Sequence, residues 1–362
     1  MVTRWQHLCS KHDSDLRLKS CVSGKKLDAI STDAVGEPAE TTPGLLPQPS
    51  MNETHSSAGA GSSGAVTKVV PKGLRSFDAR DADFFLELLP GPRDRYGLPD
   101  SIRLWKTRIE ETDPDTTFTV GLICGPSGCG KSSLMKAGLL PRLNGNVISV
   151  YLEATPTETE NRLLTGLGKR CPSLPEKLGL QKTLSMLRRG YGHPAGKKVL
   201  IVLDQFEQWL HGAKDIEKTD LVRALRHCDG QHVQCIVMVR DDFWMAAYRF
   251  MDALEIPIKE SQDYAVVDLF SIRHAEKVLA AFGRAFEAFP DGPVAVNDEQ
   301  QKFLTQVVSG ISQDDKVICV RLALFAEMMK DKDWTPATLK QVGGTEGVGV
   351  TFLEETFSAV NG

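Results

Sequence analysis

The sequence predicts an α/β protein in which a parallel sheet is flanked by helices and is followed by an all-helical subdomain. Short apolar runs alternate with helical segments through the middle of the chain, which is the order that strand–helix–strand units produce. One of these runs, VLIVL at 199–203, is apolar on both faces, as a central strand of a parallel sheet must be. Beyond residue 271 the pattern is helical throughout.

The strands of this sheet are expected to be short and to be bounded by polar or glycine-rich stretches. We expect them at 118–124, 146–154, 197–206, 232–242 and 264–270. The spacing of apolar residues predicts helices after 130, within 157–169 and 181–189, and before 227. The helical subdomain is expected to contain helices at 271–288, 297–310, 318–331 and 335–342.

The first part of the chain has the composition of a disordered tail or linker. No Phe, Tyr or Trp occurs from Gln6 to Ser76, and the stretch from Gly36 to Gly64 is rich in Gly, Pro and Ser. Such a segment buries too little apolar surface to offset the entropy of the chain. We therefore expect three parts, namely a disordered tail at 1–72, a sheet domain at 73–270 and a helical subdomain at 271–362.

Composition and charge exclude several classes of protein. With 41% hydrophobic and 25% charged residues, the chain has neither a collagen nor a coiled-coil composition. Its net charge of -4 gives no general attraction to polyphosphate, so nucleic acid is not an expected partner. No apolar run reaches the ~18 residues that span a bilayer, and the N-terminal residues lack the apolar core of a secretion signal. We therefore expect a cytoplasmic protein without membrane attachment.

The strongest motif is GPSGCGKSS at 125–133, directly after the first predicted strand. It fits the phosphate-loop pattern G-x-x-x-x-G-K-[ST], in which backbone N–H groups and a helix N-terminus converge on phosphates. Lys131 is expected to neutralise the β and γ phosphates, and the Ser132 hydroxyl to bind Mg²⁺. The residues expected to hold the nucleotide are Gly125, Pro126, Ser127, Gly128, Cys129, Gly130, Lys131, Ser132 and Ser133.

Three charged residues at strand ends are candidates for the chemistry. Asp204 ends the third predicted strand and is expected to bind Mg²⁺, the alternative being a cap of the next helix. Glu207 is expected to polarise the attacking water, unless it is only a surface residue stabilised by the helix dipole. Arg240 ends the fourth predicted strand, where a guanidinium suits the γ-phosphate. Alternatively, Arg240 forms a salt bridge to Asp241, Asp242 or Glu207.

Two further details concern the nucleotide and its loop. The pattern favours ATP over GTP, because DQFE at 204–207 lacks the glycine of D-x-x-G and EKTD at 217–220 lacks the asparagine of N-K-x-D. Cys129 lies beside Lys131 and a helix N-terminus, which is an environment that stabilises a thiolate. This suggests the hypothesis that oxidation of Cys129 blocks nucleotide binding, although the loop needs no more than a small residue there.

Four segments occur together in a characteristic order, namely GLRSFDARDADFF (73–85), GPSGCGKSSLMKAGLLPRL (125–143), VLIVLDQFEQWL (199–210) and VMVRDDFW (237–244). In this they resemble the novel STAND NTPase family. Its members are signal-transduction ATPases related to the AAA+ group and are frequent in bacterial proteins that also carry kinase and WD-repeat domains. The resemblance covers about residues 73–356 and implies a P-loop NTPase fold.

The resemblance also assigns roles to residues. It implies that Asp204 holds Mg²⁺, that Glu207 is the second acid and that Arg240 is the sensing arginine, while phosphate and metal are bound by Gly125, Gly130, Lys131 and Ser132. The segment from Phe77 to Phe85 is similar to the family's leading segment, which packs near the base.

The chain departs from the family in two places. The leading segment continues as FFLELLPGPRDR instead of FFGR, and Arg93 is the candidate substitute for the family's arginine. The stretch KVICVRLALFAEMM at 316–329 has no proline where the family often has a glycine–proline signature beside the adenine.

Three functions are consistent with these patterns. The preferred one is an ATP switch, in which slow Mg²⁺-dependent hydrolysis changes how the helical part packs on the sheet and so controls conformation or self-association. The second is a phosphotransferase or a nucleic-acid-stimulated ATPase. Its only candidate basic pairs are Arg188–Arg189 and Lys197–Lys198, both typical of a solvated surface. The third is a non-catalytic nucleotide-binding scaffold.

The expected ligands are ATP or ADP with Mg²⁺. The expected partners are further copies of the chain and sensor or effector domains, such as WD-repeat or kinase domains, on related or adjacent chains. We interpret the chain as the switch without its sensor, either as a short family member or as one piece of a longer gene product.

Overall fold

The computed structural model describes residues 76–113, 115–258, 262–290 and 296–347. All of the described residues belong to the unit Ala65–Gly362. The tail expected at 1–72 lies outside the described residues, and so does the end of the expected helical subdomain at 348–362.

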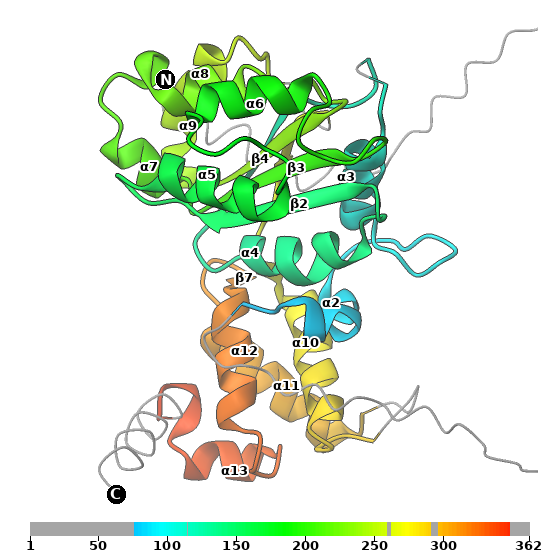
Figure 1. Cartoon of the computed structure of the whole chain (residues 1–362). Helices are drawn as coiled ribbons and strands as arrows, with labels where there is room; N and C mark the ends of the chain where they lie inside the picture. Colours follow the sequence, from blue (N-terminus) through cyan, green and yellow to red (C-terminus); the bar gives the residue numbers. More distant parts are fainter. Residues whose placement is uncertain (1–75, 114, 259–261, 291–295, 348–362) are drawn as a thin grey trace, which may run out of the picture. The chain divides into compact units, whose positions relative to one another are not determined.

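Five parallel strands form the main sheet, which confirms the predicted α/β fold (Figure 1). They are β1 (Val120–Gly125), β2 (Val147–Glu153), β3 (Lys198–Asp204), β4 (Val233–Arg240) and β5 (Tyr264–Val266). Their order across the sheet is β2-β3-β4-β1-β5. Because the strands are parallel, the residues at the carboxyl ends of β1, β3 and β4 meet at one edge of the sheet.

Alternate residues of the central strands enter two hydrophobic cores, one on each face of the sheet. In β3, Leu200 and Val202 belong to one core, and Val199, Ile201 and Leu203 belong to the other. Successive side chains of a strand point to opposite faces, so both faces of β3 must be apolar when both are covered. This explains the unbroken apolar run that predicts the strand.

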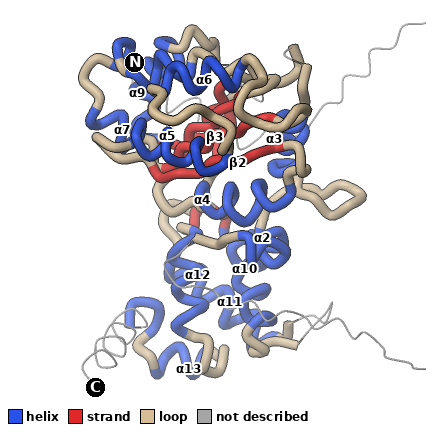
Figure 2. The backbone as a smooth tube through the Cα atoms, viewed as in Figure 1, coloured by secondary structure: helices blue, strands red, loops and turns tan. Residues whose placement is uncertain are grey.

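Helices cover both faces of the sheet (Figure 2). One core is completed by α5 (Thr159–Arg170), α6 (Leu180–Arg188), α7 (Glu207–Gly212), α8 (Asp220–Leu225) and α9 (Trp244–Ala253). The other core is completed by α2 (Ala82–Leu88), α3 (Asp100–Glu110), the helix after the phosphate loop and the helices that follow the sheet. Short 3₁₀ turns occur at Ala79–Asp81, Leu140–Arg142, Ile216–Lys218 and Asp241–Phe243.

The helix after the phosphate loop is irregular. It begins as α4 (Lys131–Ser133), continues as a π-helix over Leu134–Leu139 and ends in the 3₁₀ turn that contains Pro141, where the sequence predicts its end. Turns of π-helix are rare and are frequently found at functional sites. The predicted helix is therefore present, but only its first turn is α-helical.

Four of the helices that follow the sheet in the described residues match the predicted ones apart from their ends. They are α10 (Ile272–Ala285), α11 (Asp298–Ile311), α12 (Cys319–Met328) and α13 (Pro336–Gln341). This part also contains a strand that the sequence does not predict. The run expected at 264–270 divides into β5 and β6 (Phe270–Ser271), and β6 pairs antiparallel with β7 (Lys316–Val317). Strands of two residues are too short to show a period.

None of the described helices combines the length and the apolar character that crossing a lipid bilayer requires.

Candidate functional site

The phosphate loop connects β1 to α4 at the carboxyl edge of the sheet. Gly128 and Gly130 have φ angles of +75° and +99°, which glycine adopts without the steric cost that a side chain brings. A Cβ atom on Gly125 would lie 2.0 Å from the carbonyl oxygen of Val267. The loop conformation therefore requires a glycine at each of these three positions.

The Lys131 side chain lies along this loop. Its Nζ donates hydrogen bonds to the carbonyl oxygens of Gly125 (2.7 Å) and Pro126 (2.9 Å). Phosphate oxygens carry a full negative charge and are stronger acceptors for an ammonium group than neutral carbonyls are. The lysine is thus held at the loop by partners that a phosphate group can replace.

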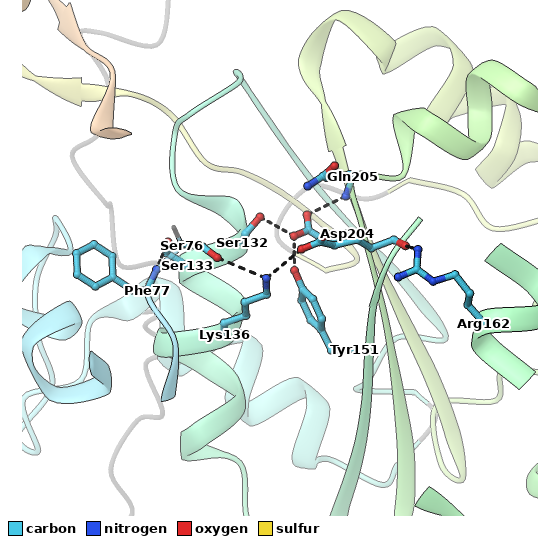
Figure 3. A network of polar contacts seen from close by, with 10 residues as sticks. Ser76, Phe77, Ser132, Ser133, Lys136, Tyr151, Arg162, Asp204 and Gln205 are labelled. Carbon is cyan, nitrogen blue, oxygen red and sulfur yellow. Dashed lines mark hydrogen bonds and ion pairs between the residues drawn. The ribbon is translucent and has the colours of Figure 1, made fainter. Parts of the chain in front are cut away.

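The Asp204 carboxylate lies beside the phosphate loop and is only 1% exposed (Figure 3). Its Oδ2 accepts a hydrogen bond of 2.5 Å from Ser132 Oγ and another from the Tyr151 hydroxyl. Its Oδ1 accepts one of 2.8 Å from the backbone N–H of Gln205. The N-cap residue of α7 is Phe206, and no side chain caps this helix. The geometry therefore links Asp204 to the loop and not to a helix cap.

Asp204 and Ser132 together fit the chemistry of a magnesium site. Mg²⁺ prefers oxygen ligands and is commonly held by one or two carboxylates together with phosphate oxygens and water. Within the described part of the chain, no lysine or arginine forms an ion pair with Asp204. A buried carboxylate without a cationic partner is energetically costly, and a divalent cation removes that cost.

Sequence reasoning misses Tyr151, although this residue reaches the same carboxylate. Burial, followed by the negative charge of Asp204, raises the pKa of the Tyr151 hydroxyl, so the group stays protonated and acts as a donor. The parallel register of β2 and β3 pairs Glu153 with Asp204, which brings the end of β2 next to the acid. The proximity of Tyr151 to Asp204 could have been predicted only from the pairing of β2 with β3.

The Glu207 side chain contacts Arg240 at the backbone N–H of Arg240 and not at its guanidinium. Glu207 is 7% exposed, and its Oε2 accepts a hydrogen bond of 3.3 Å from the Arg240 N–H. The Arg240 guanidinium donates to Asp242 instead, from Nε to Oδ1 (3.1 Å) and from Nη2 to Oδ2 (2.6 Å). Of the salt bridges that the sequence allows for Arg240, the structure forms the one to Asp242.

The thiolate expected at Cys129 is not supported. Cys129 is 4% exposed, and burial raises the pKa of its thiol more than the ammonium of Lys131, 3.7 Å from the sulfur, lowers it. The sequence argument considers the charge beside the cysteine but not its burial, and burial is the larger effect. The environment of Cys129 in this conformation therefore favours the protonated thiol, and the oxidation of Cys129 stays a hypothesis.

A cavity of about 910 Å³ brings the candidate residues together. Its polar lining contains every loop residue from Ser127 to Ser133 together with Asp204, Glu207 and Arg240. Its apolar lining includes Phe77, Phe85, Leu88, Phe270, Val278 and Phe282. Gly125 and Pro126 contribute through the carbonyls that hold Lys131. A pocket of this size with convergent polar groups and apolar walls is typical of a small-molecule site.

The leading segment forms one wall of this cavity. The Phe77 N–H donates a hydrogen bond of 3.1 Å to Ser133 Oγ, so the side chain of this loop residue is directed to the segment. Arg93 binds backbone carbonyls at the end of α2, with Nη2 at 2.5 Å from the Leu86 oxygen and 3.4 Å from that of Leu89. Arg93 therefore stabilises the wall.

The beginning of α12 contacts the phosphate loop directly. The Val320 N–H donates to the Gly128 carbonyl oxygen (3.4 Å), and the Cys319 thiol donates to that of Cys129 (3.3 Å). A Cβ atom on Gly128 would lie 2.9 Å from the side chain of Ile318. The stretch 316–329, which lacks the proline usual in the family, thus touches the loop.

In the basic pair Lys197–Lys198, considered above for nucleic acid, Lys198 is not exposed to solvent. Lys198 is only 4% exposed, and its Nζ donates hydrogen bonds to the carbonyl oxygens of Ile109 (2.9 Å) and Glu111 at the end of α3. The sequence pattern did not show this, because a lysine at the first position of an apolar strand resembles a flanking surface residue. Lys198 is unable to contribute to a basic groove.

The parallel sheet and the glycine-rich loop between β1 and α4 define the described region as a P-loop NTPase domain. The family profile described as novel STAND NTPase 1 matches residues 72–271, which is more than half of the chain. The chain belongs to this family, as the four sequence segments indicate. Family membership and the loop together support a nucleotide-binding ATPase.

Solved structures that match the chain include proteins of Pyrococcus abyssi and Aeropyrum pernix. A Walker-type ATPase of Pyrococcus abyssi has a TM-score of 0.45 and 18% identity, with 76% of this chain and 80% of that chain covered. The ORC2 protein of Aeropyrum pernix, in complexes with ADPNP and ADP, has a TM-score of 0.49 and 16% identity, with coverage of 75% and 70% respectively. No curated protein is significantly similar to the chain in sequence.

Proposed function

We propose that the chain binds ATP with Mg²⁺ at the phosphate loop and acts as a nucleotide-dependent switch with slow hydrolysis. The observation that carries the proposal is the buried Asp204 carboxylate, which has no cationic partner in the described residues and is hydrogen-bonded to Ser132. In this proposal Lys131 leaves the loop carbonyls and binds the β and γ phosphates. Mg²⁺, held by Ser132 and Asp204, supplies positive charge that stabilises the phosphate oxygens.

Hydrolysis requires a group that orients the attacking water. We assign this role to Glu207, because its carboxylate lines the same cavity as Lys131 and Asp204 and is nearly buried. Arg240 also lines the cavity and is assigned to the γ-phosphate. To reach the phosphate, its guanidinium has to leave Asp242, with which it forms a half-exposed ion pair.

The contact between α12 and the phosphate loop is the proposed route of the switch. A change in the loop on ATP binding would alter the acceptor oxygens of Gly128 and Cys129, which hold the N-terminal residues of α12. The nucleotide would then shift the population of helical-part conformations without a high turnover. Self-association and binding to sensor or effector domains are the proposed consequences.

A non-catalytic scaffold is the second candidate function. It is favoured by the two hydrogen bonds of the Arg240–Asp242 pair, which occupy the arginine assigned to the γ-phosphate. In such a scaffold ATP would be bound as a structural ligand and would not be turned over. Single-turnover hydrolysis separates this function from the switch.

The assignment of the phosphate loop is tested by thermal unfolding with and without ATP. At an ATP concentration of ~100 Kd, ligand binding should stabilise the wild-type protein by about 2.7 kcal/mol. Lys131→Ala should lose most of this increment, whereas the control Lys218→Ala, at an exposed lysine, should keep it. Equal stabilisation of the wild-type protein and Lys131→Ala would exclude phosphate binding at this loop.

A further inference from the structure

Tyr151 approaches the proposed metal site from β2 and is not part of the phosphate-loop motif. Its hydroxyl donates to Asp204 Oδ2, the oxygen that also accepts the hydrogen bond from Ser132 (Figure 3). It is absent from the residues that line the cavity, although Glu153, two positions later in β2, lines it. Tyr151 therefore contacts the acid without being part of the cavity lining.

Asp204 accepts hydrogen bonds from three groups, and these differ in how they would hold the carboxylate once a metal ion is bound. A hydroxyl oxygen such as Ser132 Oγ has lone pairs for Mg²⁺ while its hydrogen still points to the carboxylate. The Gln205 N–H comes from the next residue and follows Asp204 in any movement of the chain. Tyr151 is therefore the donor that fixes the orientation of the carboxylate relative to the sheet.

The tyrosine ring is itself held in place. The Lys136 ammonium lies 4.7 Å from the centroid of the Tyr151 ring and forms an ion pair of 3.2 Å with Glu153 Oε1. A cation over an aromatic face is attracted to the ring and restricts its position. Lys136 also donates to Ser76 Oγ (3.4 Å), so the support of the ring extends to the leading segment.

We propose that Tyr151 is a positioning residue that orients the Asp204 carboxylate for Mg²⁺ and thereby sets the Mg²⁺ affinity of the nucleotide complex. This inference rests on the proposed function of the site. Residues that hydrogen-bond to metal ligands fix the orientation of those ligands, and their loss typically weakens metal binding by about 10- to 100-fold. The phenylalanine variant removes only the hydroxyl group and keeps the ring beneath Lys136.

The test is the affinity of the full chain for a fluorescent, non-hydrolysable ATP analogue, measured in EDTA and over a series of free Mg²⁺ concentrations. For Tyr151→Phe, affinity in EDTA should equal that of the wild-type protein, and the half-saturating Mg²⁺ concentration should rise by about tenfold. The control Tyr191→Phe, at a tyrosine that is 62% exposed, should change neither value. An unchanged Mg²⁺ requirement in Tyr151→Phe overturns the proposal, as does an equal loss of affinity with and without Mg²⁺.

A double-mutant cycle with Asp204→Asn separates positioning from a general structural effect. If Tyr151 acts through the carboxylate, Tyr151→Phe should have no further effect on Mg²⁺ dependence in the Asp204→Asn background, whereas independent effects would add and overturn the proposal. A wild-type protein whose nucleotide binding does not respond to Mg²⁺ would instead contradict the proposed function. The two failures are thus distinguishable.

Discussion

The guanidinium of Arg240 is bound in bidentate fashion by the carboxylate of Asp242, two residues further along the chain, with N–O distances of 3.1 and 2.6 Å. Both side chains are about half exposed, and exposed pairs of this kind contribute at most about 1 kcal/mol. The pair is therefore weak enough for a phosphate group to displace Asp242. It is also well placed to compete with that phosphate.

Removing Asp242 as a competitor should make Arg240 available. We expect Asp242→Asn to increase the preference for ATP over ADP by up to about fivefold, which corresponds to the ~1 kcal/mol of an exposed pair. The measurement is the ratio of ATP and ADP dissociation constants by calorimetry. Asp252→Asn, at an exposed position of α9, is the control. An unchanged ratio in Asp242→Asn, or the same change in the control, would contradict the assignment of Arg240 to the γ-phosphate.

Glu207→Gln should separate binding from hydrolysis. The amide keeps the size of the side chain and still accepts a hydrogen bond from the Arg240 N–H, but it is unable to take a proton from water. We expect ATP affinity to stay within about twofold of wild type while the single-turnover rate falls by about 100-fold or more. Glu217→Gln, at an exposed glutamate, should have the wild-type rate. Hydrolysis by Glu207→Gln at the wild-type rate would show that Glu207 is not the base that activates the water.

Amide hydrogen exchange should report the contact between α12 and the phosphate loop. The Val320 N–H donates to the Gly128 carbonyl, and a γ-phosphate that orders the loop should protect this amide. We expect its exchange to be about tenfold slower with ATP than with ADP, a difference of about 1.4 kcal/mol. Amides within α5 serve as the internal reference. Identical exchange of Val320 in both complexes would show that the nucleotide state does not reach α12 by this route.

Lys198 should make the stability of the protein depend on pH in the alkaline range. Burial lowers the pKa of its ammonium group from 10.5 to about 8. Between these values the unfolded chain binds the proton and the folded protein does not, so the free energy of unfolding rises with pH. Relative to Lys198→Met, the wild-type protein should gain on the order of 1–3 kcal/mol from pH 8 to 10.5.

The control for this prediction is the neighbouring lysine. Lys197 is only partly buried, and Lys197→Met should keep the wild-type pH dependence. Urea denaturation at both pH values gives the free energies for the three proteins. If the wild-type protein and Lys198→Met respond alike to pH, the proton on Lys198 is not linked to folding.

Much of the fold and the phosphate loop could be predicted because the determining signals are local. The loop needs glycine at fixed positions between a strand and a helix, and the apolar run before Asp204 has the length of a buried strand. From their positions in the motifs, Ser132 and Asp204 are both predicted to bind Mg²⁺. The structure brings the two side chains together in a hydrogen bond of 2.5 Å.

The features that escaped prediction depend on contacts between distant segments. The Tyr151 contact follows from the pairing of β2 with β3, and the burial of Lys198 follows from its packing against the end of α3. The raised pKa of Cys129 depends on burial that no short sequence window reveals. Each of these features depends on residues that are far apart in the sequence. No local sequence motif marks Tyr151, or the burial of Lys198 and Cys129, so the tertiary structure was needed to find them.

The central claim is that Ser132 and Asp204 form the site at which Mg²⁺ joins the bound nucleotide. Its most direct test is a calorimetric titration of the wild-type protein and Asp204→Asn with ATP, each in EDTA and in Mg²⁺. We predict equal affinities of the two proteins in EDTA and an Mg²⁺-dependent gain of about tenfold or more for the wild-type protein only. The same gain from Mg²⁺ in Asp204→Asn, or no ATP binding by the wild-type protein, would contradict it.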